Sequence, residues 1–249
     1  MTKLMAATTL SGLCRNKTFS ELMNGRTGNK YLEMGVGYFC GMLEIMRQHG
    51  FKHGVGIDFS EDAINSCNEM TNEGYKDFLC EFVVENVFNV EEHFDYILMF
   101  EVLEHVDDDT KMLSKIYELT NSGGCFIMSV PAKMKLWSYS DTYVGHVRRY
   151  ERTELVKKLK MAGFKINKMI SYGFPILRIS NKIGSFILKT KQPSINLDRI
   201  EKTKKSNIVP VARFRNNFFI NIILHVQYVL GSKFDWGTGY MVICQKVQN

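Results

Sequence analysis

Short apolar runs alternate with segments of helical spacing from residue 30 onwards. Apolar runs bounded by glycine or acidic residues are typical of buried strands, and apolar residues three and four positions apart are typical of helices packed on a sheet. The pattern predicts strands over Lys30–Glu33, Gly54–Asp58, Glu81–Val84, Phe94–Phe100, Gly124–Val130, Phe164–Ser171 and Gly239–Lys246, and helices over Phe39–His49, Ser60–Gly74, Asp107–Thr120 and Arg152–Ala162.

Strand–helix alternation of this kind is typical of parallel strands joined by right-handed crossover helices. The expected fold is therefore α/β, a doubly wound three-layer sandwich with a mostly parallel seven-stranded sheet. Asp107, Asp108 and Asp109 open one of the helices. Acidic side chains stabilise the positive end of a helix dipole, so we expect these three to act as caps only.

The regular alternation stops between Tyr172 and Trp236. Two apolar helical segments are expected there, Pro175–Lys189 and Ala212–Leu230, with a lysine-rich linker between them. An excursion before the last strand can cover a substrate without disturbing the sheet. The expected organisation is an N-terminal helical segment (1–29), a core (30–171), a helical insertion or lid (172–236) and the final strand of the core (237–249).

Composition places the chain among globular proteins. Of its 249 residues, 45% are hydrophobic and 23% are charged, which excludes disordered and fibrous classes. The net charge of +6 is too small to indicate a nucleic-acid partner. Residues 31–110 carry three basic and eighteen acidic side chains (−15), whereas residues 111–249 carry twenty-four basic and seven acidic ones (+17). One half of the sequence therefore repels anions and the other attracts them.

The six cysteines show no CxxC spacing, which predicts buried, reduced thiols rather than disulfides or a metal site. The first fourteen residues weakly resemble a signal peptide, but Leu13 before Cys14 does not suit lipoprotein cleavage, and we expect a helix instead. The apolar run Phe218–Leu230 is interrupted by polar residues and is too short to span a bilayer. We expect a soluble, cytoplasmic protein.

Chemically useful residues follow several of the expected strands. Ligands of doubly wound sheets bind beyond the carboxyl ends of the strands. The first strand leads into Glu33, Gly35 and Gly37, and the glycines let the backbone pass close to a ligand. The second ends at Asp58, twenty-one residues after Gly37, where a carboxylate can accept both hydroxyls of a ribose. The sequence therefore predicts a nucleoside-containing cofactor.

Two alternatives remain open at this point. A complete GxGxxG turn would indicate a dinucleotide, but Cys40 stands at the position of the third glycine. This departure disfavours a nicotinamide-dependent oxidoreductase. A catalytically silent binding subunit is the other alternative, and the intact glycine turn with Asp58 argues against it.

Taken together, these segments resemble the class I S-adenosylmethionine-dependent methyltransferases. YLEMGVG is similar to the first motif of that family and GVGIDFSEDAI to the second. FDYILMFEVLEHVDD resembles the fourth-strand motif of its small-molecule branch, and GHVRRYERTELVKKLKMAGFKI the segment before the sixth strand. That branch includes quinone- and natural-product-modifying enzymes, so the resemblance implies methyl transfer to an oxygen, nitrogen or carbon atom of a metabolite.

The resemblance also implies which residues hold S-adenosylmethionine. Glu33 and the Gly35–Gly37 turn would bind its amino-acid part, and Glu101 would flank the methionine moiety. Asp58 would bind the ribose, with Phe59 beside the adenine. Asn86 stands where the family usually has an aspartate that accepts a hydrogen bond from the adenine amino group, and an amide oxygen can make the same contact.

Methyl transfer from a sulfonium mainly requires alignment of the nucleophile, and a base matters only when the nucleophile starts protonated. His105 and His146 are the candidate bases because imidazole titrates nearest neutral pH. For His105, a role in the site and a purely structural role are equally supported. No metal ion is expected.

The segment around His146 is the expected acceptor pocket, since the family builds its pocket after the fifth strand. Arg148 or Arg149 would contact an anionic part of the acceptor, with Tyr143 and Tyr150 beside it. The alternative is a surface loop whose arginines pair with nearby carboxylates.

The expected partner is a small, anionic acceptor. Residues 133–215 carry twenty basic and five acidic side chains, although a solvated basic face explains them as well. Contact with an anionic membrane through the 175–230 helices is less favoured. A nucleic-acid substrate is not expected, because the Asn/Asp-Pro-Pro-Tyr/Phe motif that grips a flipped base is missing.

Overall fold

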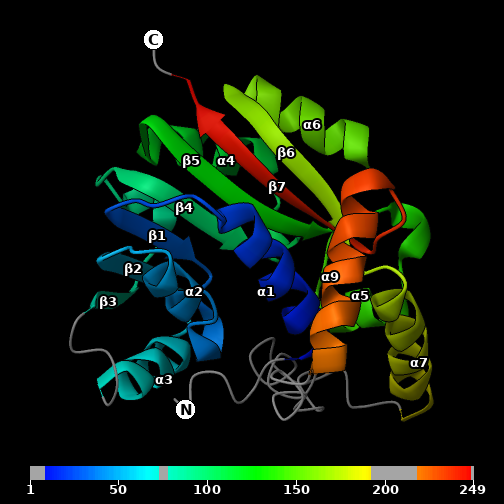
Figure 1. Cartoon of the computed structure of the whole chain (residues 1–249). Helices are drawn as coiled ribbons and strands as arrows, with labels where there is room; N and C mark the ends of the chain where they lie inside the picture. Colours follow the sequence, from blue (N-terminus) through cyan, green and yellow to red (C-terminus); the bar gives the residue numbers. More distant parts are fainter. Residues whose placement is uncertain (1–8, 73–77, 192–217, 248–249) are drawn as a thin grey trace.

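The computed structural model describes residues 9–72, 78–191 and 218–247. Helices cover both faces of a seven-stranded sheet (Figure 1). The strands are β1 (Lys30–Met34), β2 (His53–Asp58), β3 (Leu79–Val84), β4 (Phe94–Phe100), β5 (Thr120–Pro131), β6 (Phe164–Tyr172) and β7 (Gly239–Lys246). The α-helices are α1 (Leu10–Met23), α2 (Leu43–Gln48), α3 (Glu61–Asn72), α4 (Asp109–Leu119), α5 (Tyr139–Val144), α6 (Arg152–Met161), α7 (Ile176–Lys191) and α9 (Phe218–Lys233).

The sheet has the order β3-β2-β1-β4-β5-β7-β6. All neighbouring pairs from β3 to β5 are parallel, which confirms the expected α/β, mostly parallel, doubly wound sheet. β7 instead runs antiparallel to both β5 and β6. Gly239 at the start of β7 pairs with Tyr172 at the end of β6, so the excursion leaves and re-enters the sheet at the carboxyl ends of the parallel strands. A strand that begins at these ends has to run antiparallel to its neighbours.

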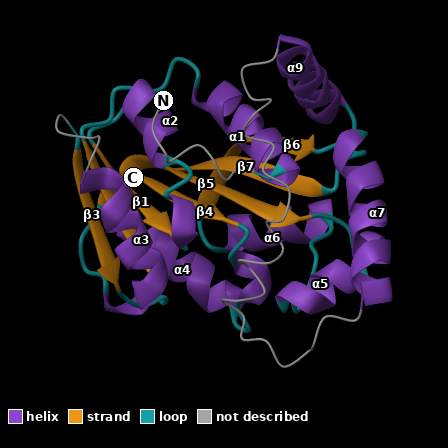
Figure 2. Ribbon diagram, turned by 90° about the horizontal axis from the view of Figure 1, so that it is seen from below, coloured by secondary structure: helices purple, strands orange, loops and turns teal. Residues whose placement is uncertain are grey.

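Two hydrophobic clusters hold the helices on opposite faces of the sheet. Along β4, Leu98 and Phe100 contact the cluster that includes side chains of α1, α2 and α3, whereas Ile97 and Met99 contact the cluster under α4 and α6. This alternation follows from the two-residue period of a strand. Figure 2 shows α1, α2 and α9 on one side of the sheet and α4 and α6 on the other.

The helix expected over Phe39–His49 begins later than predicted. The backbone forms a 3₁₀ turn over Gly37–Phe39, and Cys40 then adopts a left-handed conformation with φ 43°. A left-handed residue interrupts the helical hydrogen-bond ladder, so α2 begins only at Leu43. The side chain of Phe39 lies outside the described residues.

Part of the segment 141–150, for which a surface loop was the alternative interpretation, is helical. Ser138 and Asp141 form a reciprocal capping box at the start of α5. Its six residues are too few to show helical periodicity in the sequence. Residues 141–144 are therefore not a loop.

The excursion contributes two helices to different parts of the fold. α7 packs on α5, and α9 packs on α1 and β6 (Figure 1). The expected linker beyond residue 191, the beginning of the helix expected from Ala212, and the first eight residues lie outside the described residues. None of the described helices combines the length and apolarity needed to cross a bilayer. All six cysteines are free, as predicted, and Cys80 is half-buried while the others are buried.

Candidate functional site

The carboxyl ends of β1, β2 and β4 lie side by side and bring together residues that are far apart in the sequence. Met34 at the end of β1 pairs with Ile57 on β2 and with Met99 on β4. Glu33, Asp58 and Glu101 therefore lie at neighbouring strand ends. The order of the strands reverses at β1 and β4, which is where doubly wound folds bind ligands.

The glycine turn and Asp58 are locked together. The backbone N–H of Gly37 donates to Oδ2 of Asp58 at 3.0 Å, and the N–H of Ser60 donates to Oδ1 at 3.0 Å. Gly35 has φ +68°, and a Cβ there would lie 2.5 Å from a methyl carbon of Val102. A Cβ on Gly37, by contrast, would meet nothing within 4 Å. The turn therefore packs against Val102 at Gly35 and has free space beside its backbone at Gly37.

A narrow apolar cavity continues from this turn. Asp58 and the largely exposed Phe59 line it, together with Val87, Val102 and Met112. It offers one carboxylate beside an aromatic and aliphatic slot, which suits a ribose joined to a flat base. Asn86 does not line this cavity, whereas Glu85 does.

Asn86 has a local structural role. Its Oδ1 accepts a hydrogen bond from the backbone N–H of Phe88 at 3.0 Å and caps the 3₁₀ turn Val87–Asn89. That oxygen is the one expected to accept from an adenine amino group. Capping this turn engages one lone pair of the oxygen, and the expected contact of Asn86 with the adenine stays a prediction.

Glu33 is a buried acid at the end of β1, with 6% of its surface exposed. Burial raises the pKa of Glu33 to about 8, the charge of Arg15 opposes the shift and that of Asp58 adds to it. Arg15 lies on α1 and also opposes the rise in pKa of Glu104. Sequence reasoning missed Arg15 because nothing in its local pattern links the N-terminal helix to the strand ends.

Glu101 is held by two hydroxyl donors. Its Oε1 accepts hydrogen bonds from the hydroxyls of Ser129 at 2.6 Å and Tyr172 at 3.0 Å. Its backbone has φ +55°, an uncommon conformation for a residue with a side chain and one that clusters at functional sites. The carboxylate lines a second cavity of about 240 Å³ together with His146 and Tyr172.

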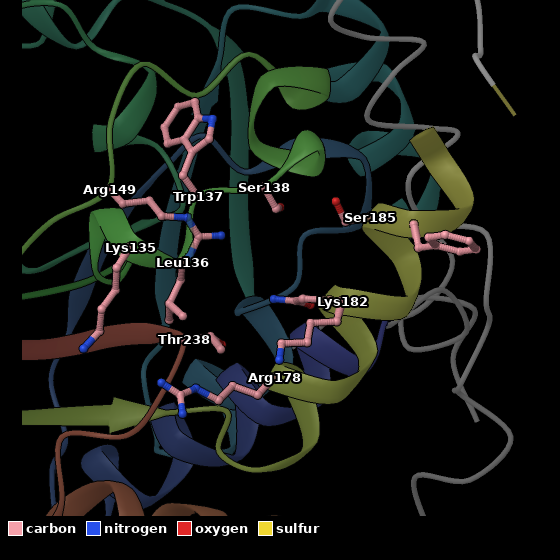
Figure 3. Close-up of a pocket in the computed structure, with 11 residues that line it drawn as sticks. Lys135, Leu136, Trp137, Ser138, Arg149, Arg178, Lys182, Ser185 and Thr238 are labelled. Carbon is pink, nitrogen blue, oxygen red and sulfur yellow. The ribbon is translucent and has the colours of Figure 1, made fainter. Parts of the chain in front are cut away.

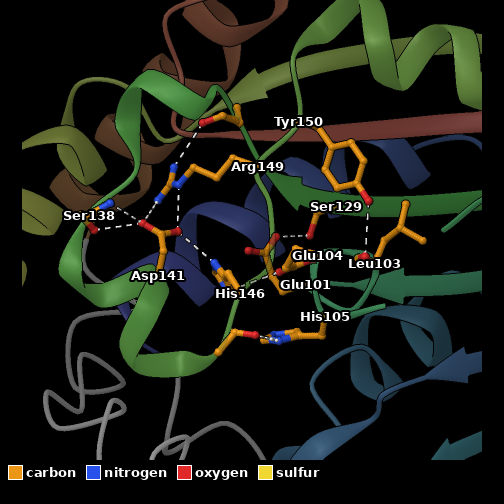
Figure 4. A network of polar contacts seen from close by, with 12 residues as sticks. Glu101, Leu103, Glu104, His105, Ser129, Ser138, Asp141, His146, Arg149 and Tyr150 are labelled. Carbon is orange, nitrogen blue, oxygen red and sulfur yellow. Dashed lines mark hydrogen bonds and ion pairs between the residues drawn. The ribbon is translucent and has the colours of Figure 1, made fainter. Parts of the chain in front are cut away.

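Asp141 fixes the orientation of His146 in that cavity (Figure 4). Its Oδ1 lies 2.9 Å from Nδ1 of His146 and accepts from Nε of Arg149 at 2.8 Å. Burial alone would raise the pKa of Asp141, but the hydrogen bonds of His146 and Arg149 outweigh it and lower the pKa to about 2. Since Asp141 is a charged acceptor, Nδ1 of His146 donates to it, and Nε2 points towards the carboxyl group of Glu104.

Glu104 is fully buried next to this histidine. One of its carboxylate oxygens lies 3.7 Å from Nε2 of His146, and neither oxygen has a hydrogen-bond partner among the described residues. Burial and the charge of Glu101 raise the pKa of Glu104 well above its usual range. No role was expected for Glu104 from its position in the sequence, because it lies in the 3₁₀ turn Leu103–His105, where a solvated acid is common.

Glu104, His105 and His146 form a cluster with ligand atoms within 4.8 Å of one another. The rings of the two histidines meet edge to face at 4.9 Å, and Nδ1 of His105 lies 3.1 Å from the carbonyl oxygen of Gly145. Each histidine thus binds an oxygen through Nδ1, as metal-ligating histidines do. On ligand type and spacing, these three residues could hold a divalent cation.

The two arginines of this segment pair with carboxylates, as the alternative interpretation of the sequence expected. Arg149 is buried and doubly hydrogen-bonded to Asp141, yet it still lines the cavity of His146. Arg148 donates to Asp109 at 3.0 Å and does not line that cavity. Asp109 thus holds the guanidinium of Arg148 outside this cavity, and its expected contact with the acceptor stays a prediction.

Asp109 is a buried ion-pair centre rather than a cap. It accepts hydrogen bonds from Arg148, from Lys158 at 2.8 Å and from the hydroxyl of Tyr150 at 2.9 Å. Burial would raise the pKa of Asp109, but these donors outweigh it and lower the pKa. The cap of α4 is Asp108, which accepts from the N–H of Lys111.

The two tyrosines of the segment lie away from the site. Tyr150 is fully buried and donates to Asp109, and its expected contact with the acceptor stays a prediction. Tyr143 is buried on α5 and stacks on Tyr139, and it does not line the His146 cavity either. Of the residues expected around the acceptor, His146 and Arg149 line that cavity.

Comparisons with known proteins point to one family. A family model described as a methyltransferase domain matches residues 9–168. A Caenorhabditis elegans protein named phosphoethanolamine N-methyltransferase 2 is 27% identical over 173 residues, 68% of this chain and 37% of that protein. A Mycolicibacterium smegmatis protein named "probable S-adenosylmethionine-dependent methyltransferase" is 25% identical over 101 residues, 39% of each chain. The chain thus matches well under half the length of either relative.

Solved structures show the same fold. Geranyl diphosphate C-methyltransferase from Streptomyces coelicolor, solved with Mg²⁺, geranyl diphosphate and S-adenosylhomocysteine, superposes with a TM-score of 0.60. The match covers 94% of this chain and 79% of that one at 13% identity. At this identity the likeness concerns the fold, and function has to be argued from the site.

Proposed function

The chain belongs to the methyltransferase-domain family, and on that premise we propose that it transfers the methyl group of S-adenosylmethionine to an oxygen, nitrogen or carbon atom of a small-molecule acceptor. One observation carries the proposal: the Gly37 N–H donates to Asp58 beside an apolar cavity that Val102 lines, and the preceding residue, Glu101, lines a second cavity together with His146.

The residues at the strand ends fit this cofactor chemically. S-adenosylmethionine has a cationic sulfonium and an ammonium group, and two acids, the buried Glu33 and the half-buried Glu101, can carry the opposing negative charge where β1 and β4 end. Gly35 and Gly37 let the backbone approach the amino-acid part. Asp58 would accept the ribose hydroxyls, with Phe59 against the adenine. When bound, the cofactor supplies an already activated methyl group.

The chain's own contribution is alignment and proton transfer. The His146 cavity would hold the acceptor atom in line with the methyl group, and good alignment is worth about 7–11 kcal/mol. Nε2 of His146 would accept the proton of an acceptor hydroxyl or ammonium, while Asp141 keeps the ring oriented. His105 would act through His146, whose ring it contacts.

The acceptor is proposed to be anionic. The basic excess of residues 133–215 and Arg149 in the cavity wall favour a negatively charged group. The names of two similar proteins, phosphoethanolamine N-methyltransferase and geranyl diphosphate C-methyltransferase, describe phosphate-bearing acceptors. We propose that the reaction belongs to the biosynthesis of a metabolite. We further propose that it takes place in the cytoplasm, because six unpaired cysteines suit a reducing compartment.

Isothermal titration calorimetry tests the proposal directly. We expect the protein to bind S-adenosylhomocysteine, the product form of the cofactor, and not NADH. No binding of S-adenosylhomocysteine at millimolar concentration would favour a silent binding subunit, and binding of NADH alone would favour an oxidoreductase. Both results contradict the proposed function.

A further inference from the structure

A large cavity lies outside the cofactor site, between α7 and residues 135–138. Its volume is about 550 Å³, within the usual range for small-molecule pockets. Figure 3 shows Lys182 and Ser185 reaching towards it from α7, with Leu136, Trp137 and Ser138 on the opposite side. Sequence analysis assigned no role to these residues.

The lining of this cavity is strongly basic. Four of its lining residues are lysine or arginine, and none is aspartate or glutamate. Asp141 neutralises Arg149. The other three, Lys135, Arg178 and Lys182, enter no ion pair within the described part of the chain. About three positive charges therefore face the cavity without a carboxylate beside them.

Arg178 is poised to bind an oxyanion. Its Nε is buried and has no hydrogen-bond partner among the described residues, and its guanidinium lies over the ring of Phe174 at 5.9 Å. Lys182 follows one helical turn later on α7, so the two cations are neighbours that repel each other. An anion between them would relieve the repulsion and satisfy the unpartnered Nε. Guanidinium and ammonium groups together are typical of phosphate sites.

The basic cavity adjoins the cavity of His146. Ser138, Arg149, Asn181 and Thr238 line both of them. A single molecule can therefore place one end on Arg178 and the other beside His146. Leu136 and Trp137 add apolar surface along the way.

We propose that the basic cavity is the subsite for a phosphate ester of the acceptor, with Arg178 and Lys182 as its anchors. The identification of this ligand as the acceptor rests on the proposed methyl transfer, whereas phosphate binding itself does not. The two substrates would then be sorted by charge. The cationic cofactor goes to the acidic strand ends of residues 31–110, and the anionic acceptor goes to the basic wall built from later residues.

Titration with inorganic phosphate tests the subsite. Binding is followed by calorimetry at constant ionic strength, set with chloride, for the wild type and for the Arg178→Gln/Lys182→Gln double variant. Lys157→Gln, on the exposed face of α6, is the control for the loss of a positive charge away from the cavity. Hydrogen bonds from charged donors predict that the double variant weakens phosphate binding at least about tenfold, and that the control leaves it unchanged. S-adenosylhomocysteine affinity is measured on all proteins to verify folding.

Three results overturn the proposal: no phosphate binding by the wild type at millimolar concentration, equal binding by the double variant, or an equal loss in Lys157→Gln. Acetate that competes as well as phosphate overturns the choice of a phosphate ester in favour of a carboxylate. The proposed function fails separately. If phosphate binding depends on Arg178 but the protein does not bind S-adenosylhomocysteine, the proposed methyl transfer is contradicted while the anion site is supported.

Discussion

Cofactor binding should release a proton from Glu33, and replacing this residue should remove the effect. Glu33 is almost fully buried, and burial raises its pKa to about 8, so the free protein holds this acid mostly neutral near pH 7. A bound ammonium or sulfonium favours the carboxylate and lowers the pKa again. The affinity for S-adenosylmethionine should therefore rise by up to about tenfold per pH unit between about pH 6 and 8, and then level off.

The same shift predicts a cost to stability. The folded-state pKa of about 8 exceeds the ordinary value of 4.5 for a glutamate carboxyl group. For an acid, stability is then fully present below the unfolded pKa and is lost as the pH rises through the folded pKa. The gap corresponds to at most about 5 kcal/mol at 1.36 kcal/mol per unit. Glu33→Gln removes the ionisation, so this variant should be more stable than the wild type at about pH 8.5 and close to it at about pH 4.5.

Two assays check this prediction. Calorimetric titration with S-adenosylmethionine across the pH range measures affinity and proton release, and urea unfolding at both pH values measures stability. Glu69→Gln, an exposed acid on α3, is the control and should behave like the wild type. The reasoning is refuted if Glu33→Gln keeps the pH dependence of the wild type, because Glu33 would then not be the group that titrates.

Three further substitutions test the surroundings of the site. Gly35→Ala, with φ +68° and a Cβ 2.5 Å from Val102, should destabilise the fold by about 1–3 kcal/mol in urea unfolding, whereas Gly41→Ala, which meets open space, should be close to neutral. Asp109→Asn, which leaves buried cations poorly paired, should cost about 3 kcal/mol, and the stabilising effect of Asp109 should fade in the wild type as the pH falls through its lowered pKa. Asp141→Asn should lower the turnover number about a hundredfold or more with unchanged S-adenosylhomocysteine affinity, since His146 loses its oriented, charged acceptor. Wild-type stability in Gly35→Ala or Asp109→Asn, or wild-type turnover in Asp141→Asn, would contradict these assignments.

The parallel part of the sheet was predictable because each of its strands is a local apolar run. The candidate cofactor-binding residues follow directly where these runs end. The direction of β7 was not predictable, since it depends on where the excursion of about sixty residues returns to the sheet. The capped helix α5 escaped detection because six residues show no clear period.

The cofactor side of the site was also easier to predict than the acceptor side. Gly37 and Asp58 follow adjacent strands, so their contact is implied by strand order. The partner of Arg148, however, is thirty-nine residues away, at the start of α4. Sequence spacing cannot tell an arginine that binds substrate from one that pairs with Asp109, because the deciding contact is tertiary.

The most direct test of the account is the affinity of Asp58→Ala for S-adenosylhomocysteine, measured by calorimetry beside Glu69→Ala. A carboxylate that accepts two ribose hydroxyls contributes about 1.5–3 kcal/mol, so the dissociation constant should rise about ten- to a hundredfold in the first variant and stay constant in the second. Urea unfolding establishes that both variants are folded. A folded Asp58→Ala protein that binds as tightly as the wild type would contradict the claim that this strand end holds the adenosyl cofactor.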